Sequence, residues 1–224
     1  EDEQMTRFIF RNVVTQNPRP TTAGGFAGAH ITPFEAAQFM NAVQELAENT
    51  RLGIPSMFKS NSRNHVEFDA RAGINEESGA FSSWPKESGL AATRDMDLIA
   101  DFAKAMRQEW TSIGLRGMYG YMGDLSTEPR WYRVHETFSE DAQLTANIIT
   151  TLVKNLQGES LSSRSVAMTI KHFPGGGPQE GGGDPHYAFG KNQVYPAQKF
   201  DYHLLPFEAA IKAAASSIMA YYGI

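Results

Sequence analysis

The sequence contains no cysteine among its 224 residues. This absence excludes disulfide bonds, thiol nucleophiles and cysteine-ligated metal sites. It leaves the compartment open, because secreted and cytosolic proteins both occur without cysteine. Any chemistry of this chain must therefore use other side chains.

Long apolar runs and a basic surface are also lacking. No run approaches the ~18 apolar residues that span a bilayer, so we expect no membrane partner. The net charge is −5 and the basic residues form no stripe, which argues against nucleic acid as a partner.

Metal and nucleotide signatures are missing as well. No Gly-Lys-Ser/Thr sequence follows the glycine run 175–177, and Glu180 stands where a dinucleotide fingerprint needs its third glycine. The histidines form no compact zinc-binding pattern. We therefore expect neither a metal nor a cofactor. The six histidines are His30, His65, His135, His172, His186 and His203.

Apolar periodicity predicts helices that alternate with short, continuous apolar strands. Thr32 is the expected N-cap of the first helix, with Pro33 at its first position and Glu35 completing a capping box. Ser139 is the expected cap of the third. The predicted helices are 32–50, 95–114, 139–158 and 203–215, and the predicted strands are 52–58, 115–122, 165–170 and 216–222. The apolar face expected for the first helix is Phe34, Ala37, Phe39, Met40, Val43 and Leu46.

This alternation predicts an α/β fold with a parallel sheet of βα units. Polar, aromatic and basic residues gather just after the strands, where a (β/α)₈ barrel builds its active site. Four unrelated surface loops are the alternative interpretation. Four or five units cannot close a barrel of eight, so we expect residues 1–224 to be the N-terminal part of an incomplete TIM-like barrel. Sequence outside this chain would complete it. The loops are 59–65, 123–136, 171–186 and 221–224.

Two of these loops have side chains suited to a polyhydroxylated ring. Arg133 and Glu136 can donate to and accept from vicinal hydroxyls, and Trp131 offers an apolar face. Lys171 and His172 add donors where a strand ends in KHFPGGG. The alternatives are a loop held together by Arg–Glu pairs and a buried Trp, and a glycine turn with a solvent-exposed lysine.

Together these residues resemble the family 3 glycoside hydrolases, in particular their β-glucosidase branch. The resemblance covers most of the chain. It implies a (β/α)₈-like first domain, an α/β sandwich domain after it, and retaining hydrolysis of β-linked sugars by two carboxyl groups. The motifs that carry it are TRLGIP, WPKESGLAATRD, EWTSIGL, EPRWYRVHETFSEDAQL, VKNLQG, KHFPGGG and IMAYY.

The resemblance also implies roles for individual residues. Arg133 matches the arginine that holds the sugar, with Glu136 at the associated acidic position. Lys171 and His172 match a pair that donates to sugar hydroxyls, and Tyr221 matches a tyrosine beside the nucleophile. Asn61 stands where the family has an aspartate that grips the sugar. An amide is the weaker acceptor, and Arg63 or Asp69 could compensate.

The resemblance places the nucleophilic Asp and the acid/base Glu downstream of this chain, so we expect no catalytic residue within it. The expected enzyme is a β-glucosidase that cleaves terminal glucosyl residues from β-linked gluco-oligosaccharides. It would act only with its C-terminal remainder, in the periplasm or outside the cell. Two alternatives stay open: a β-N-acetylglucosaminidase with an Asp184/His186 acid–base dyad, and a non-catalytic sugar-binding barrel.

Overall fold

The computed structural model describes residues 5–18, 29–66 and 78–224. Its main feature is a five-stranded sheet in which all neighbouring strands are parallel. The strands have the same order in the sheet as in the chain, as they do in a (β/α)₈ barrel. They are β1 (Arg7–Ile9), β4 (Met57–Ser60), β5 (Gly117–Met118), β6 (Ala167–Phe173) and β7 (Ser217–Ala220).

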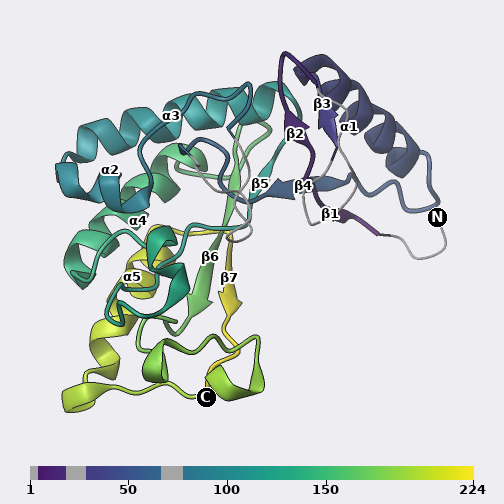
Figure 1. The fold of residues 1–224 in the computed structure, drawn as a ribbon. Helices are drawn as coiled ribbons and strands as arrows, with labels where there is room; N and C mark the ends of the chain where they lie inside the picture. The colour runs from purple at the N-terminus through teal and green to yellow at the C-terminus, as the bar shows by residue number, and fades with distance from the viewer. Residues whose placement is uncertain (1–4, 19–28, 67–77) are drawn as a thin grey trace.

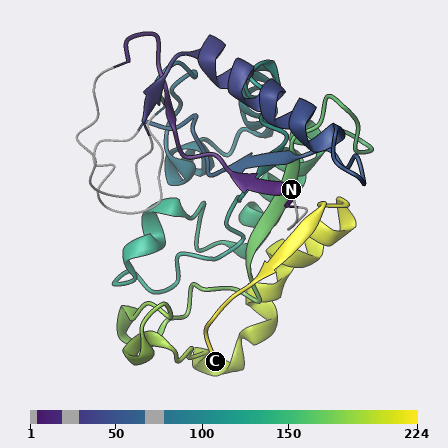
Figure 2. The ribbon, with the colours of Figure 1, turned by 90° about the vertical axis from the view of Figure 1, so that its right-hand side faces the viewer.

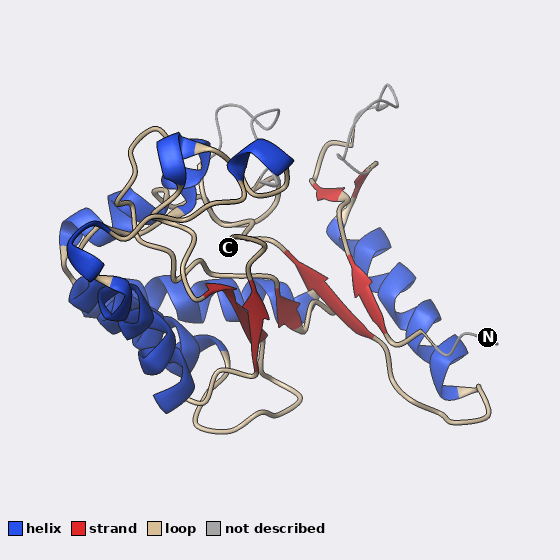
Figure 3. Ribbon diagram, turned by 90° about the horizontal axis from the view of Figure 1, so that it is seen from below, coloured by secondary structure: helices blue, strands red, loops and turns tan. Residues whose placement is uncertain are grey.

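Helices connect the strands and lie around the outside of the sheet (Figure 1). Figure 3 shows the strands fanned side by side, and Figure 2 follows them from β1, in purple, to β7, in yellow. A separate two-stranded parallel sheet pairs β2 (Val13–Val14) with β3 (His30–Ile31). The predicted α/β class and the incomplete barrel are confirmed. The helices are α1 (Pro33–Glu48), α2 (Glu87–Thr93), α3 (Met96–Ser112), α4 (Ala142–Leu156) and α5 (Phe200–Lys212).

Of the two helix N-caps predicted from the sequence, one is confirmed and the other is wrong. The capping box of α1 is confirmed: the Thr32 hydroxyl accepts from the Glu35 N–H, and the Glu35 carboxylate accepts from the Thr32 N–H at 2.8 Å. The prediction that Ser139 caps α4 is wrong. Asp141 caps it, because its carboxylate accepts from two N–H groups of the first turn at 2.9 and 3.0 Å.

The observed strands differ in their bounds from all four predicted ones: β5 and β7 are shorter, and β6 runs three residues further. The prediction of a strand at 52–58 is wrong in its first half, since β4 begins only at Met57. Gly53 has a left-handed φ of 59° and Pro55 has no N–H to donate, so the chain turns there before the strand begins. Pattern reading also missed β1, which pairs with β4, because three residues are too few to show a period.

The core lies between the sheet and helices α3 and α4. In both helices the fully buried side chains recur at three- and four-residue spacing, which places them on one face. Trp110 keeps its indole N–H satisfied by donating to Asn64 Oδ1 at 2.9 Å. The other large buried side chains of these helices are Ile99, Phe102, Met106, Ile148, Ile149, Leu152, Val153 and Leu156.

Helix α1 buries only part of the face that its sequence predicts: Met40 is buried and Val43 packs against the core. Phe34, Phe39 and Leu46 are 70%, 52% and 56% exposed, while the buried side chains are Ala36 and Met40. The prediction was wrong for Phe34, Phe39 and Leu46, because periodicity locates an apolar stripe but not the surface that covers it.

Replacement of a core leucine should destabilise the protein far more than the same change outside the core. We expect Leu152→Ala, in α4 and fully buried, to lower the free energy of unfolding by about 2–5 kcal/mol. The matched control Leu161→Ala removes a side chain that is 57% exposed and should change it by less than about 0.5 kcal/mol. Urea unfolding of the intact protein measures both, and equal effects would contradict the assigned core.

Candidate functional site

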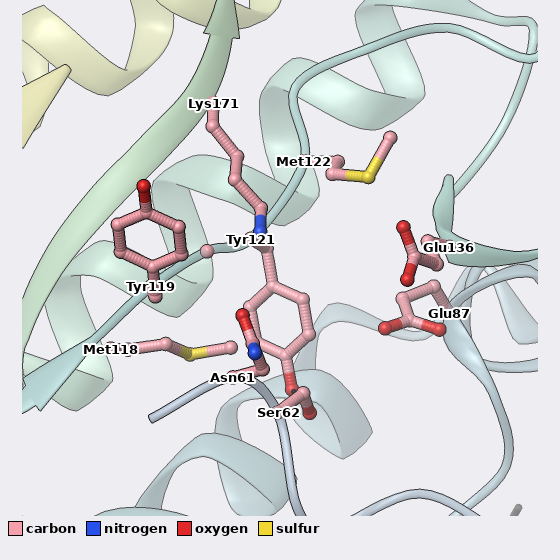
Figure 4. Close-up of a pocket in the computed structure, with 10 residues that line it drawn as sticks. Asn61, Ser62, Glu87, Met118, Tyr119, Tyr121, Met122, Glu136 and Lys171 are labelled. Carbon is pink, nitrogen blue, oxygen red and sulfur yellow. Dashed lines mark hydrogen bonds between the residues drawn. The ribbon is translucent and has the colours of Figure 1, made fainter. Parts of the chain in front are cut away.

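Residues at the ends of three neighbouring strands line one pocket (Figure 4). They come from the segments that follow β4 and β5 and from the end of β6, with further walls from α2 and the 3₁₀ helix η2 (Tyr132–Glu136). For these loops the interpretation as unrelated surface segments is wrong. The lining residues are Asn61, Ser62, Glu87, Met118, Tyr119, Gly120, Tyr121, Met122, Glu136 and Lys171.

Arg133 and Glu136 form a buried ion pair beside this pocket. Arg133 Nε donates to Glu136 Oε2 at 2.7 Å, and Nη2 lies 2.6 Å from the same oxygen. Burial alone would raise the pKa of Glu136, but the charges of Arg133 and Lys171 outweigh it and hold that pKa below its ordinary value. Burial likewise opposes the guanidinium charge, yet Glu136 keeps the pKa of Arg133 above its usual range. Both groups are therefore charged at neutral pH.

His172 is held by Asp124 on one side and by Arg133 on the other. Its Nδ1 lies 3.1 Å from Asp124 Oδ2, and its Nε2 lies 3.2 Å from Arg133 Nη1. Because a carboxylate only accepts, Nδ1 carries the proton, and Nε2 accepts from the guanidinium in the neutral ring. Burial lowers the pKa of His172, although Asp124 opposes the shift. Both ring nitrogens thus have protein partners, and donation to a ligand stays a prediction.

Asp124 is fully buried and was missed by the sequence interpretation. Its Oδ2 accepts from the His172 backbone N–H at 2.9 Å, and its Oδ1 accepts from the Gly176 N–H. A Cβ on Gly176 would lie 2.7 Å from Oδ1, so the glycine permits this approach. Burial would raise the pKa of Asp124, but His172 and its hydrogen bonds lower it on balance. The carboxylate therefore ties the loop after β5 to the turn after β6.

Lys171 points into the pocket from the end of β6 (Figure 4). Its Nζ lies 4.8 Å from the centre of the Tyr119 ring, and its backbone continues the pairing of β5 with β6 through Met122. The side chain is 4% exposed. Burial lowers the pKa of Lys171 to about 8, and the Arg133 charge adds to the shift. The alternative interpretation of Lys171 as a solvent-exposed lysine is therefore wrong. Its amine faces the cavity with a pKa of about 8.

The structure places Asn61 in the pocket but not Arg63. Arg63 is completely buried, and its guanidinium donates to Ser60 Oγ and to the carbonyls of Asn12 and Phe10 at 2.7–2.8 Å. These contacts fasten the segment after β1 to β4. The suggestion that Arg63 compensates for Asn61 in sugar binding is therefore corrected: its donors are engaged in the core. Asp69 lies outside the described residues.

Tyr221 and the Asp184/His186 pair do not line this pocket. The Tyr221 ring is 4.8 Å from that of His172, and its hydroxyl is buried with no hydrogen-bond partner among the described residues. His186 Nδ1 donates to Asp184 Oδ1 at 2.5 Å, while Trp131 Nε1 donates to Asp184 Oδ2 at 3.3 Å. Trp131 is 1% exposed, which agrees with its interpretation as a buried loop anchor.

Glu87 is the pocket residue that the sequence interpretation did not select. It stands at the start of α2 within WPKESGL and is 4% exposed. A charged residue at the first position of a helix is common on a protein surface, so nothing local distinguishes it from a solvated one. In the part of the chain that the structure describes, no cluster of His, Asp and Glu side chains could hold a metal ion. No helix there is long and apolar enough to cross a membrane.

The fold and the pocket define an α/β barrel-type domain with a polar site at the carboxyl ends of its strands. Residues 23–222 match the glycosyl hydrolase family 3 N-terminal domain. The chain therefore belongs to glycosyl hydrolase family 3.

Known relatives agree with this assignment. β-Glucosidase C of Emericella nidulans is 44% identical over 189 residues, which is 84% of this chain and 30% of that protein. The periplasmic β-glucosidase/β-xylosidase of Dickeya chrysanthemi is 37% identical over 86% of this chain and 29% of that protein. The crystal structure of an exo-1,3/1,4-β-glucanase from a Pseudoalteromonas species has the same fold, with a TM-score of 0.76 and 21% identity over 98% of this chain and 26% of that one. The chain spans about a third of the length of the curated relatives it matches.

Removal of the Asp124 charge should weaken the fold in a pH-dependent way. We expect Asp124→Asn to lower the free energy of unfolding by about 3 kcal/mol at pH 7, because it leaves buried donors poorly paired. The lowered pKa of Asp124 means that its contribution is present above its unfolded pKa of 3.8 and is lost as the pH falls through the lower folded value.

Urea unfolding at pH 7 and at stepwise lower pH measures this difference. The control Asp101→Asn changes a carboxylate that is 69% exposed and should have little effect. A difference between wild type and Asp124→Asn that grows on acidification would contradict the assignment.

Proposed function

We propose that the intact protein is a retaining β-glucosidase, which hydrolyses terminal non-reducing β-D-glucosyl residues of oligosaccharides. In this proposal the present chain supplies the wall that holds the glucosyl unit. The single observation that carries it is the convergence of Asn61, Glu136 and Lys171 on one pocket, from the segment after β4, the loop after β5 and the end of β6. A neutral ring with several hydroxyls needs donors and acceptors aimed at one place, and this pocket has both.

The remaining predicted residues have supporting or adjacent roles in this proposal. Arg133 fixes the Glu136 carboxylate and, through Nη1, the His172 ring. The buried Tyr221 hydroxyl has no hydrogen-bond partner among the described residues, and in this proposal it donates to a carboxylate from the rest of the protein. Retaining enzymes need two carboxyl groups about 5–5.5 Å apart. We assign both, a nucleophilic Asp and an acid/base Glu, to the rest of the protein.

We further propose that residues 1–224 form the first part of a barrel domain, which the C-terminal remainder completes. The five strands are fewer than the eight of a closed barrel. Large apolar side chains are exposed at both ends of the sheet, on α1 near β1 and on α5 near β7. Such exposure favours a covering partner. The side chains in question are Phe34, Phe39, Leu46, Leu205 and Ile211.

A second candidate function is supported by the Asp184/His186 pair. The two side chains are already hydrogen-bonded, and a carboxylate-oriented imidazole is a competent acid/base. This would suit a β-N-acetylglucosaminidase. The pair does not line the pocket, so the β-glucosidase is favoured. A site of action outside the cytoplasm is proposed from the periplasmic relative, and the proposed chemistry requires no cofactor.

Turnover of two aryl glycosides distinguishes these functions. We expect the intact protein to hydrolyse an aryl β-glucoside faster than the matching aryl N-acetyl-β-glucosaminide, because the Asp184/His186 pair does not line the pocket. A spectrophotometric assay of the released phenol measures both rates. Faster turnover of the acetylated sugar would favour the second function, and turnover of neither would leave a binding barrel.

The Lys171 ammonium should control the alkaline side of the pH profile. We expect kcat/KM for the β-glucoside to fall as the pH rises through about 8, since the charged donor is lost there. Lys171→Met should lower kcat/KM by about 10- to 100-fold at pH 7 and remove this decline. Lys212→Met, which changes a lysine that is 78% exposed, is the control. An unchanged alkaline decline in Lys171→Met would contradict the role.

A further inference from the structure

Glu87 places a second carboxylate in the pocket, next to that of Glu136 and across from Lys171 (Figure 4). Its side chain is about 95% buried. It enters the pocket from α2, which does not directly follow a strand of the five-stranded sheet. Three elements of different kinds thus direct charged groups into one cavity: a strand end, a 3₁₀ helix and the start of an α-helix.

No described side chain or backbone group donates a hydrogen bond to Glu87 Oε2. Oε1 lies 3.5 Å from His65 Nε2, beyond ordinary hydrogen-bond length. His65 Nδ1 lies 2.6 Å from the Pro85 carbonyl, which only accepts, so Nδ1 carries the proton. In the neutral ring Nε2 therefore accepts, and it does so from the Tyr121 hydroxyl at 2.9 Å. In this tautomer His65 donates no hydrogen bond to the carboxylate.

A buried carboxylate oxygen without a donor is costly, and native proteins seldom retain one without a role. Lys171 provides an opposite charge, since Glu87 is among the groups that oppose the lowering of its pKa. It makes no hydrogen bond that satisfies Oε2. Oε2 can therefore accept a hydrogen bond from a ligand in the cavity, and a sugar hydroxyl is a suitable donor.

We propose that Glu87 is a specificity-determining residue that accepts a hydrogen bond from one hydroxyl of the bound glycone. This inference rests on the proposed function and deepens it. Asn61 lines the same pocket with an amide, a weaker acceptor than a carboxylate. Glu87 therefore supplies a strong acceptor beside Glu136, whose Oε2 is already engaged by Arg133, and it selects neutral sugars that carry a hydroxyl at the position it faces.

Binding of glucose and its four monodeoxy analogues, lacking the hydroxyl at C2, C3, C4 or C6, tests this inference. Calorimetry on the intact protein compares wild type with Glu87→Gln, which keeps the side-chain shape and removes the charge. We expect wild type to bind one analogue about 10- to 100-fold more weakly than glucose, and Glu87→Gln to lose most of that discrimination. The control Glu45→Gln, at an exposed position of α1, should retain the wild-type pattern.

The outcomes separate this inference from the proposed function. Equal discrimination by wild type and Glu87→Gln, or no binding of glucose by wild type, overturns the role of Glu87. Binding with the expected pattern but without hydrolysis of any β-glucoside overturns the β-glucosidase and leaves Glu87 as a sugar-binding residue. If Glu87→Gln does not fold, Glu87→Asp retracts the carboxylate and should lose the same discrimination, and a wild-type pattern in that variant counts against the role.

Discussion

The carboxylate of Asp124 joins two loops that are separate in the sequence, and the pocket depends on this junction. Its two oxygens accept from the backbone of His172 and Gly176 and from the imidazole. The end of β6 and the segment after β5 are thereby held at a fixed separation. Lys171 directly precedes His172, and Arg133 contacts the His172 ring through Nη1, so a residue that does not line the cavity fixes a neighbour of both side chains.

Charge balance explains how so many ionisable groups share a small volume. Arg133 neutralises Glu136 at hydrogen-bond distance, and Asp124 orients a neutral His172. Lys171 and Glu87 also line the cavity, and they are less completely paired than Glu136. Polar groups are costly when buried without partners. The structural pairs therefore hold the site together, while the incompletely paired groups are left for a ligand.

Much of the fold could be predicted because its signals are local. The order of helices and strands, the capping box at Thr32 and the strand-end position of Lys171 follow from spacing within a few residues. The departures have one common cause. Exposure of Phe34, the engagement of Arg63 in the core and the short strand β1 all depend on which distant segment lies opposite, and no periodicity contains that information.

The sequence by itself therefore determined the βα alternation, the capped start of α1 and the family motifs that point to Arg133, Glu136, Lys171 and Tyr221. Only the tertiary structure decided that Asp124 would anchor the site and that Glu87, from an inconspicuous helix start, would turn inward to it. The physical reason is that burial and hydrogen-bond partnership are properties of contacts between segments tens of residues apart. A carboxylate on the surface and one in a cavity look the same in the sequence.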